Sequence, residues 1–255
     1  MGMGDEAKHP VKATARTLKI IATLKQLDWA GVTKLADQLD TSKSVVHNHL
    51  STLEEHDYVV KGEGGYSLGL RFLEMGGYRR NKMTLYRMGK PEVDALAEET
   101  GELVNIAVEE HGQCVYLYRS RGSQSVHLDI HAGERAAMST TALGKSMLAF
   151  MYDDRVNQIL GDVPLPAMTE HSFTDPEELR AELAVTRERG YAIDNEEQLE
   201  GLRCVSAPIR QDGEVLGAIS VSAPTNRLKG DRLEQTVPDK VVSAANVIEL
   251  NSVHS

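Results

Sequence analysis

Residues 32–68 have the sequence VTKLADQLDTSKSVVHNHLSTLEEHDYVVKGEGGYSL. The pattern predicts a short helix over 32–39, a break at Asp40-Thr41 and a second helix that starts at Ser42. A strand over 58–61, a glycine turn and a returning strand over 66–68 follow. Two short helices at an angle and then a β hairpin are typical of a winged helix-turn-helix, which places its second helix in the major groove of DNA.

The second helix has an apolar and a polar face. Val46, Leu50 and Leu53 recur at i, i+4 and i+7, which predicts that this face is buried. Short polar side chains occupy the opposite face beside Lys43, and they are Ser44, His47, Asn48 and Ser51. Such donors and acceptors suit base edges and phosphates, and Ser42 or Thr41 is expected to cap the helix. The alternative is an ordinary solvated helix, which the adjoining hairpin makes the weaker interpretation.

Three further residues are candidate DNA contacts. Arg16 lies on the helix that precedes this segment, and Lys61 and Tyr66 lie on the two strands of the hairpin. Charge supports a DNA-binding N-terminal part, because residues 1–82 hold 12 Lys and Arg against 10 Asp and Glu, whereas residues 83–255 hold 16 against 28. A mildly positive head on an acidic body is expected of a DNA-binding module joined to a domain that avoids DNA.

Composition places the chain among cytoplasmic proteins with two modest domains. Its 255 residues suffice for two hydrophobic cores. It has no run of eighteen apolar residues and no basic-then-apolar N-terminal signal, so we expect a soluble protein without a membrane partner. Cys114 and Cys204 are far apart and lack metal-like spacing, which favours a reduced cytosolic chain.

The remaining pattern predicts helices around one antiparallel sheet. A helix over 13–27, with Leu18, Ile21 and Leu24 facing inward, completes the N-terminal core. A connecting helix over 70–82 is broken in pattern by Gly76-Gly77. Further helices are predicted over 90–100, 142–150, 176–189 and 233–250, and hairpins over 103–118 and 203–221. Hairpin, helices, hairpin and final helix indicate an α+β body.

Six segments along the chain resemble a known family. They are Ala15-Arg-Thr-Leu18, Tyr66-Ser-Leu-Gly-Leu70, Ser139-Thr-Thr-Ala-Leu-Gly-Lys145, Glu188-Arg-Gly-Tyr-Ala-Ile-Asp-Asn-Glu-Glu197, Gly201-Leu-Arg-Cys-Val-Ser-Ala-Pro208 and Ala218-Ile-Ser-Val-Ser-Ala-Pro224. Their order and spacing resemble the IclR family of bacterial and archaeal transcription regulators over nearly the whole chain.

The resemblance implies a fold and a function. It implies a winged helix-turn-helix domain over 1–69, a linker helix over 70–83, and a GAF-like effector-binding and oligomerisation domain over 84–255. The expected function is sequence-specific DNA binding controlled by a small organic or aromatic acid, without enzyme activity, cofactor or metal. Members of the family act as homodimers, or as homotetramers built from dimers, on palindromic operators.

The resemblance also implies an effector pocket. Its positions fall on Ala142, Leu143, Asp194, Cys204, Ser220 and Ser222. The N–H groups of Ala142 and Leu143 at a helix N-terminus favour a carboxylate. Ser220 and Ser222 are two apart on a strand, so both hydroxyls point to one face.

Each pocket residue has a plainer interpretation. The two serines could face solvent, and Cys204 could be a small buried hydrophobe. Asp194 could only cap a turn, and in an anion site it would have to bind a hydroxyl or share a proton with the ligand. His127, Asp129 and His131 would share a face of a strand and, with Cys204, form an optional zinc site, although unbound surface histidines are favoured.

Two other functions remain as alternatives. An enzyme could use Cys204 as a nucleophile, but no Cys-His pattern accompanies it. An architectural DNA-binding protein would need no effector, and a thermal-shift screen of organic acids without any stabilisation would favour it.

The second helix departs from the family at two positions. The family usually has a threonine and then an arginine where this chain has Val45 and Asn48. Asn can form two hydrogen bonds with adenine, whereas Arg favours guanine or phosphate. The family's average operator should therefore not be transferred to this chain.

Asn48→Ala should relax sequence preference more than it lowers non-specific affinity, because a base contact specifies and a phosphate contact only positions. A gel-shift comparison of operator and random DNA measures both effects. Equal losses on the two DNAs would contradict a base-reading role for Asn48.

Overall fold

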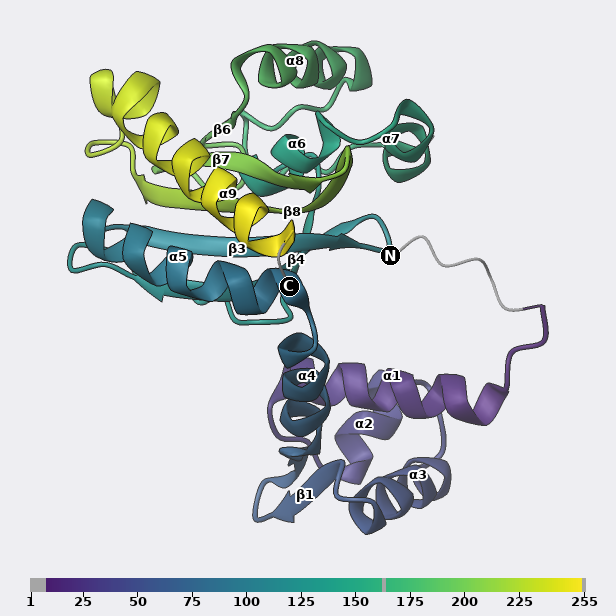
Figure 1. The fold of residues 1–255 in the computed structure, drawn as a ribbon. Coiled ribbons are helices and arrows are strands. Elements are labelled where there is room, and N and C mark those ends of the chain that lie inside the picture. Colours follow the sequence, from purple (N-terminus) through teal and green to yellow (C-terminus); the bar gives the residue numbers. More distant parts are fainter. Residues whose placement is uncertain (1–7, 162–163, 254–255) are drawn as a thin grey trace. The chain divides into compact units, whose positions relative to one another are not determined.

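The computed structural model describes residues 8–161 and 164–253. The chain forms two compact units, divided between Arg79 and Arg80. Both units are drawn in Figure 1. The predicted α+β class is confirmed: helices and a small hairpin make up the first unit, and an antiparallel sheet with helices makes up the second.

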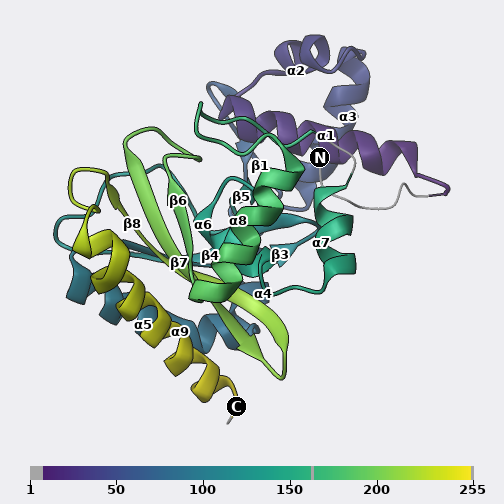
Figure 2. The same ribbon diagram turned by 90° about the horizontal axis from the view of Figure 1, so that it is seen from above.

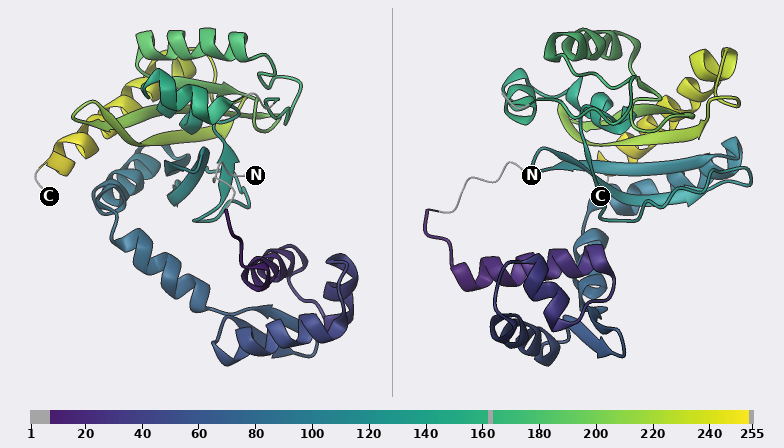
Figure 3. Two further views of the ribbon diagram at one scale, coloured as in Figure 1. Left: turned by 90° about the vertical axis from the view of Figure 1, so that its right-hand side faces the viewer. Right: turned by 180° about the vertical axis from the view of Figure 1, so that it is seen from behind.

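The first unit is a winged helix-turn-helix (Figure 3). Its elements are α1 (Lys12–Leu27), α2 (Val32–Gln38), α3 (Lys43–Glu55), β1 (Val59–Gly62) and β2 (Gly65–Leu68), and α4 (Arg71–Asn81) follows. The strands β1 and β2 pair antiparallel, with Lys61 opposite Tyr66. Tyr66 also pairs through its backbone with Ala30, with both N–H···O distances at 3.0 Å. The β1–β2 hairpin, which is the wing, is therefore hydrogen-bonded to the turn between α1 and α2.

The core of this unit follows the helical period. Val46, Leu50 and Leu53 are buried as the spacing predicts. The prediction that Leu18 faces inward is wrong, because its side chain is 60% exposed while Ile20 and Leu24 are fully buried. Residues two apart on a helix lie on nearly opposite sides, so a core face through Ile20 places Leu18 outside.

Two predicted helix limits change in the structure. The predicted pattern break at Gly76-Gly77 does not end the connecting helix, since α4 continues through both glycines. The helix predicted over 90–100 begins six residues earlier, as α5 (Thr84–Thr100), and contains Pro91. It ends at Gly101 in the left-handed conformation, as expected for a helix stop.

The second unit is built on one six-stranded sheet with the order β5-β4-β3-β8-β7-β6. All neighbouring strands are antiparallel. The strands are β3 (Leu103–Glu110), β4 (Gln113–Arg121), β5 (Arg135–Ala137), β6 (Ala192–Asn195), β7 (Leu202–Gln211) and β8 (Glu214–Pro224). Both predicted hairpins, β3–β4 and β7–β8, are confirmed, and they meet at the centre of the sheet through β3 and β8.

Helices cover both faces of the sheet (Figure 2). The helices α5 and α9 (Val237–Val253), the latter preceded by a π-helical turn over Arg232–Thr236, pack on the first face. The other face carries α6 (Ala142–Leu148), α7 (Asp153–Leu160) and α8 (Pro176–Arg189). The first face is closed by aliphatic side chains such as Val104, Ile106, Val205, Ile219 and Val221.

The helix α6 lies very close to the backbone that precedes it. A Cβ on Gly144 would stand 2.2 Å from the carbonyl oxygen of Met138 and 2.5 Å from its Cα. All seven residues of α6 are buried, and Thr141 caps the helix by accepting from the N–H of Gly144 at 3.0 Å. The close approach at Gly144 therefore packs α6 directly against the backbone that follows β5.

Gly144→Ala should lower the free energy of unfolding by about 1–3 kcal/mol, because the added methyl meets backbone that has no rotamer to change. Gly77→Ala is the matched control, since a Cβ there meets nothing within 4 Å. It should leave stability unchanged or raise it by up to about 1 kcal/mol, as alanine favours a helix over glycine. Urea unfolding measures both, and equal stabilities of the two variants would contradict this packing.

Candidate functional site

The outer face of α3 presents the polar side chains that the sequence predicts. Ser42 caps the helix by accepting from the N–H of Val45 at 3.3 Å. The exposed candidates on this helix are Lys43, Ser44, His47, Asn48 and Ser51. Because Val46, Leu50 and Leu53 anchor the opposite face, the helix offers these polar groups on a rigid support.

A basic hollow adjoins the start of α3. It has a volume of about 280 Å³ and is lined by α1 and by the turn before α3. Arg16, which is exposed, lies there with Lys12 and Lys19, next to Asp40 and Thr41. Three cations beside a helix N-terminus make this part of the surface suitable for phosphate groups.

Tyr66 does not share this exposure. Its side chain is only 4% exposed and belongs to the core of the first unit, so its predicted role as a DNA contact does not fit this conformation. The alternation of the β2 strand points Tyr66 inward, where its backbone also pairs with Ala30. Lys61 is exposed, with its Nζ 5.7 Å from the centre of the Tyr66 ring.

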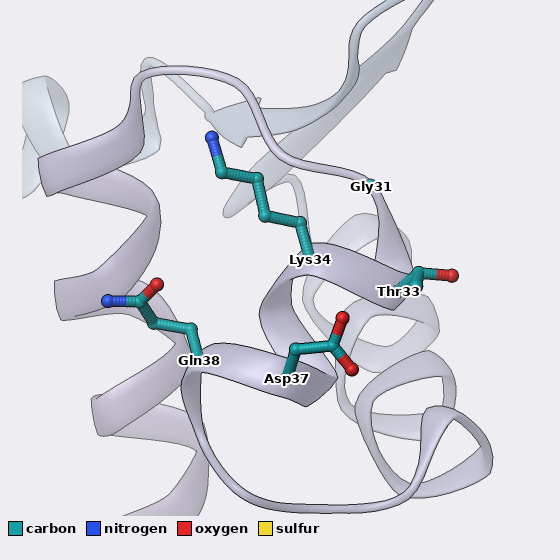
Figure 4. A pocket seen from close by; sticks show the side chains of 5 residues that line it. All are labelled: Gly31, Thr33, Lys34, Asp37 and Gln38. Atoms are coloured by element: carbon teal, nitrogen blue, oxygen red, sulfur yellow. The ribbon is translucent and has the colours of Figure 1, made fainter.

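A second hollow lies over α2 and lacks comparable chemistry. It is lined by Gly31, Thr33, Lys34, Asp37 and Gln38 (Figure 4). The side chains of Lys34 and Asp37 extend in different directions in this view, and only Lys34 is basic. This arrangement is typical of a solvated helix surface.

The second unit has a polar region on the sheet face below α6. The register places Asn105, Ser220 and Ser206 side by side on β3, β8 and β7. In the next row Ser222, Cys204 and Asp194 are neighbours on β8, β7 and β6. Strand residues of one row share a face, so these side chains point together toward α6.

Most of this polar group is deeply buried. Ser220, Ser222 and Asp194 are each less than 5% exposed, and Cys204 is half-buried. Predicted pocket residues Ala142 and Leu143 are buried at the start of α6. From α6, Ser146 shares a hydrogen bond of 2.9 Å between its Oγ and that of Ser206. The serines do not face solvent, so the plainer interpretation of them is wrong.

A buried ion pair stands beside this region. The Nζ of Lys145 donates to both carboxylate oxygens of Glu197 at 2.5 Å, and the Lys145 side chain is fully buried. Asp194 Oδ1 accepts from the N–H of Glu197 at 2.7 Å and from that of Gln198 at 3.4 Å. Asp194 therefore caps the turn after β6 and also faces the polar region.

Burial, together with the charge of Glu197, raises the pKa of Asp194 to about 7 against the opposing effects of Lys145 and of the two backbone N–H groups. Burial also raises the pKa of Glu197, while Lys145 opposes that shift. Near neutral pH Asp194 thus changes between a hydrogen-bond donor and an anion. The awkwardness of a carboxylate in an anion site is reduced when Asp194 carries its proton.

Two residues of this region were not found from the sequence. Asn105 is 3% exposed and donates from Nδ2 to Ser222 Oγ at 3.4 Å, while its Oδ1 is buried without a hydrogen-bond partner. Arg119 is its register partner on β4. Asn105 and Arg119 lie on different strands, and only the register of β3 and β4 brings them together, so no local sequence pattern indicates them.

The thiol chemistry of this region is unfavourable for catalysis. Burial raises the pKa of Cys204 well above its usual range, and the charge of Asp194 raises it further. A neutral thiol is a poor nucleophile. Burial likewise raises the pKa of Cys114 to about 12.

The zinc option loses its geometric basis. His127, Asp129 and His131 lie on an irregular segment and not on a strand. His127 Nδ1 contacts Arg121 at 3.1 Å, and His131 Nδ1 contacts the carbonyl of Ala132 at 3.1 Å. Within residues 8–161 and 164–253, no three His, Cys, Asp or Glu side chains gather as metal ligands would.

Among the described residues, 8–161 and 164–253, no helix combines the length and apolarity needed to cross a membrane.

Comparison with known proteins gives consistent matches along the whole chain. The family model "Bacterial transcriptional regulator IclR C-terminal" matches residues 80–250, and "IclR helix-turn-helix domain" matches residues 13–63. A probable HTH-type transcriptional regulator ArcR of Halobacterium salinarum is 34% identical over 94% of this chain and 93% of its own length.

Two solved structures share the fold. The IclR structure of Thermotoga maritima has a TM-score of 0.78 at 26% identity, covering 94% of this chain and 98% of that one. An IclR homolog of Microbacterium hydrocarbonoxydans, complexed with 4-hydroxybenzoate, has a TM-score of 0.81 at 22% identity, covering 96% and 100%.

The raised pKa of Asp194 predicts a pH-dependent stability. The folded chain holds this proton more tightly than the unfolded chain, whose ordinary value is 3.8. The stabilisation is therefore fully present below about pH 4 and is lost as the pH rises through about 7. Asp194→Asn keeps an oxygen for the two backbone N–H groups, so it should be the more stable protein at pH 8 and flatten the decline from pH 5 to 8.

Thermal unfolding from pH 5 to 8 measures this difference. Asp212→Asn is the control, because Asp212 lies in the exposed turn between β7 and β8 at a positive φ of 52° that asparagine also adopts. A parallel pH dependence of Asp194→Asn and wild type would contradict the assignment.

Proposed function

Because the chain belongs to the IclR family of transcription regulators, we propose that it binds an operator through α3 and the wing, under control of a small organic acid bound on the polar sheet face. The family consists of regulators, so the alternative of a Cys204-dependent enzyme is wrong. The single observation that carries the effector part is the buried group of Ser220, Ser222 and Asp194 beneath α6.

In the DNA-bound state the two kinds of side chain have different tasks. Ser44, His47, Asn48 and Ser51 face base edges in the major groove, where hydroxyl, imidazole and amide groups distinguish bases. Phosphate contacts come from Arg16, Ser42, Lys43 and Lys61, with support from Lys12 and Lys19 in the basic hollow. Tyr66 positions the wing from within the core.

The effector is held by hydroxyls and backbone N–H groups together. Ser220 and Ser222 line the floor, Cys204 and Asp194 continue it, and the first N–H groups of α6 at Ala142 and Leu143 lie at the opposite wall. The complex of the Microbacterium homolog with 4-hydroxybenzoate supports an organic acid as the ligand class. Asn105 Oδ1 and the Nε and Nη2 atoms of Arg119 are buried beside this region without a hydrogen-bond partner among the described residues. This disfavours an architectural protein without a ligand, because burying polar groups without partners is costly.

Self-association fits the exposed apolar side chains next to the wing. Leu70, Leu73 and Tyr78 are each more than 60% exposed, and all three lie at or on α4. A second copy would remove this surface from water, and a two-fold dimer matches a palindromic operator. The proposed assembly is a homodimer or a tetramer of two dimers, acting in the cytoplasm where the operator is.

Regulation requires a difference between two states. The effector changes DNA affinity only as far as it binds one arrangement of the body more tightly than the other. The helix α4 joins the two units, so it is the proposed linker, over 70–83, that carries this difference to paired DNA-binding domains, over 1–69.

Ser220→Ala with Ser222→Ala should leave DNA binding intact and abolish the effector response, because both hydroxyls lie in the body and not on α3. The measurement is a gel shift on the DNA upstream of the chain's own gene, with and without an acid that a thermal-shift screen finds to stabilise the wild type. Ser243→Ala, an exposed serine on α9, is the control and should respond like wild type. A double variant that still responds fully would place the effector elsewhere.

A further inference from the structure

Arg119 is a cation on the sheet face that carries the polar region. One edge of its guanidinium, formed by Nε and Nη2, has no hydrogen-bond partner among the described residues. Its Nη1 donates to the carbonyl of Leu128 at 3.0 Å and also to that of Ile130. Its Nε and Nη2 are buried and form no hydrogen bond. The two N–H groups at Nε and Nη2 lie on one edge of the guanidinium, which is the edge that a carboxylate engages with both oxygens.

The strand register places Arg119 at one end of the polar region. Arg119 is opposite Asn105, which is opposite Ser220, which is opposite Ser206. Neighbouring strands lie about 4.8 Å apart, so this row extends across four strands from β4 to β7. The segment over 122–134 covers the β4 end, and the Nη1 contacts to Leu128 and Ile130 tie Arg119 to that segment.

Asn105 complements Arg119 in hydrogen bonding. Its Nδ2 is engaged by Ser222, whereas its Oδ1 is an acceptor buried without a donor. A ligand hydroxyl can supply that donor, and a bare carboxylate cannot. Because Arg119 and Asn105 are register partners on neighbouring strands, a ligand with a hydroxyl on the carbon next to its carboxylate can offer this donor to Asn105 while the carboxylate engages Arg119.

The charges of the region favour the same orientation. Asp194 and Glu197 stand at the β6 end, and the charge of Lys145 there is already paired with Glu197. Arg119 forms no ion pair with a carboxylate among the described residues. Burial and the charge of Arg121 lower its pKa, and the charges of Glu134 and Asp129 oppose that shift. A carboxylate is therefore attracted to the β4 end, and hydroxyls are accommodated toward Asp194.

We propose that Arg119 binds the effector's carboxylate through Nε and Nη2, and that Asn105 Oδ1 accepts from a neighbouring hydroxyl. The ligand class is a 2-hydroxy monocarboxylic acid. This inference rests on the proposed function and refines it. It moves the carboxylate to β4, away from the N–H groups of Ala142 and Leu143, which the sequence predicts to bind it.

The test uses the full-length chain and a fixed panel of acids at pH 7.5. Thermal shift is measured with glycolate, L-lactate, D-glycerate and D-gluconate, each against its own amide, and propanoate serves as the acid without a hydroxyl. The acids are expected to raise Tm more than their amides, and lactate is expected to bind more tightly than propanoate. If no acid stabilises the wild type more than its amide, the proposal is overturned.

The contacts of Arg119 and Asn105 are then tested in variants, by measuring the Kd of the acid that raises the Tm of the wild type most. Arg119→Gln should weaken binding on the order of 10- to 100-fold, because a bidentate charged pair is lost. Arg119→Lys, which keeps the charge without the planar edge, should lie between this variant and wild type. Asn105→Ala should remove the preference for lactate over propanoate. Arg121→Gln is the matched control on the same strand and face, where Arg121 is exposed, and should bind like wild type.

A purely structural role for Arg119 gives a different pattern. In that case Arg119→Gln lowers Tm without ligand and leaves the Kd of the acid unchanged, which overturns the proposal. If acid binding survives in Arg119→Gln but is lost in Ser220→Ala with Ser222→Ala, the sheet-face site stands and only the carboxylate assignment fails. If the acid binds both variants as it binds wild type, the sheet face itself is not the site and the proposed function fails too.

Discussion

The second unit is organised by the need to bury a polar face of a sheet. One face of its six-stranded sheet is covered by α5 and α9 and carries aliphatic side chains, which can be buried without hydrogen-bond partners. The other face carries Asn105, Ser206, Ser220, Ser222 and Asp194, all less than 5% exposed. Buried polar groups cost free energy unless they are hydrogen-bonded, so the elements above this face must supply partners.

The fold supplies some of these partners and leaves others to a ligand. Ser146 on α6 pairs with Ser206, Lys145 on α6 pairs with Glu197, and Thr141 caps the helix that holds them. The helix α6 itself packs closely against the backbone of Met138 at Gly144. On this face, and within the described part of the chain, the buried atoms left without partners are Nε and Nη2 of Arg119, which are donors, and Oδ1 of Asn105, which is an acceptor. Effector binding would complete the hydrogen bonding that folding leaves incomplete.

Short-range patterns were sufficient for the parts of the fold that depend on neighbours in sequence. The period of α3 placed Val46 and Leu50 in the core, and turn residues located both hairpins of the body. The sequence pattern predicts that Leu18 is buried because a helix of mixed composition has more than one apolar face. Only tertiary packing decides that the face with Ile20 is the buried one. The extension of α5 past Pro91 likewise depends on packing against the sheet, where Gly89 approaches Ile106.

The candidate site likewise has residues that local spacing predicts and residues that only strand pairing brings together. Ser220 and Ser222 share a strand, so their common face followed from spacing alone, whereas Arg119 and Asn105 meet only through pairing of separate strands. A register shift between Ile106 and Ala107 decides which β4 residues join that face, and no local pattern indicated it. Tyr66 was misjudged for a related reason, since its partner Ala30 lies outside the hairpin.

In the proposed regulator, one acid site on the sheet face and one DNA surface on α3 are energetically coupled. Coupling between two binding sites is reciprocal, so the Kd of a stabilising acid must differ between free protein and protein saturated with its operator. Isothermal titration of the acid into both states measures this directly. We expect two Kd values that differ by the factor by which the acid changes DNA affinity, whereas equal values would show that the two sites are not coupled.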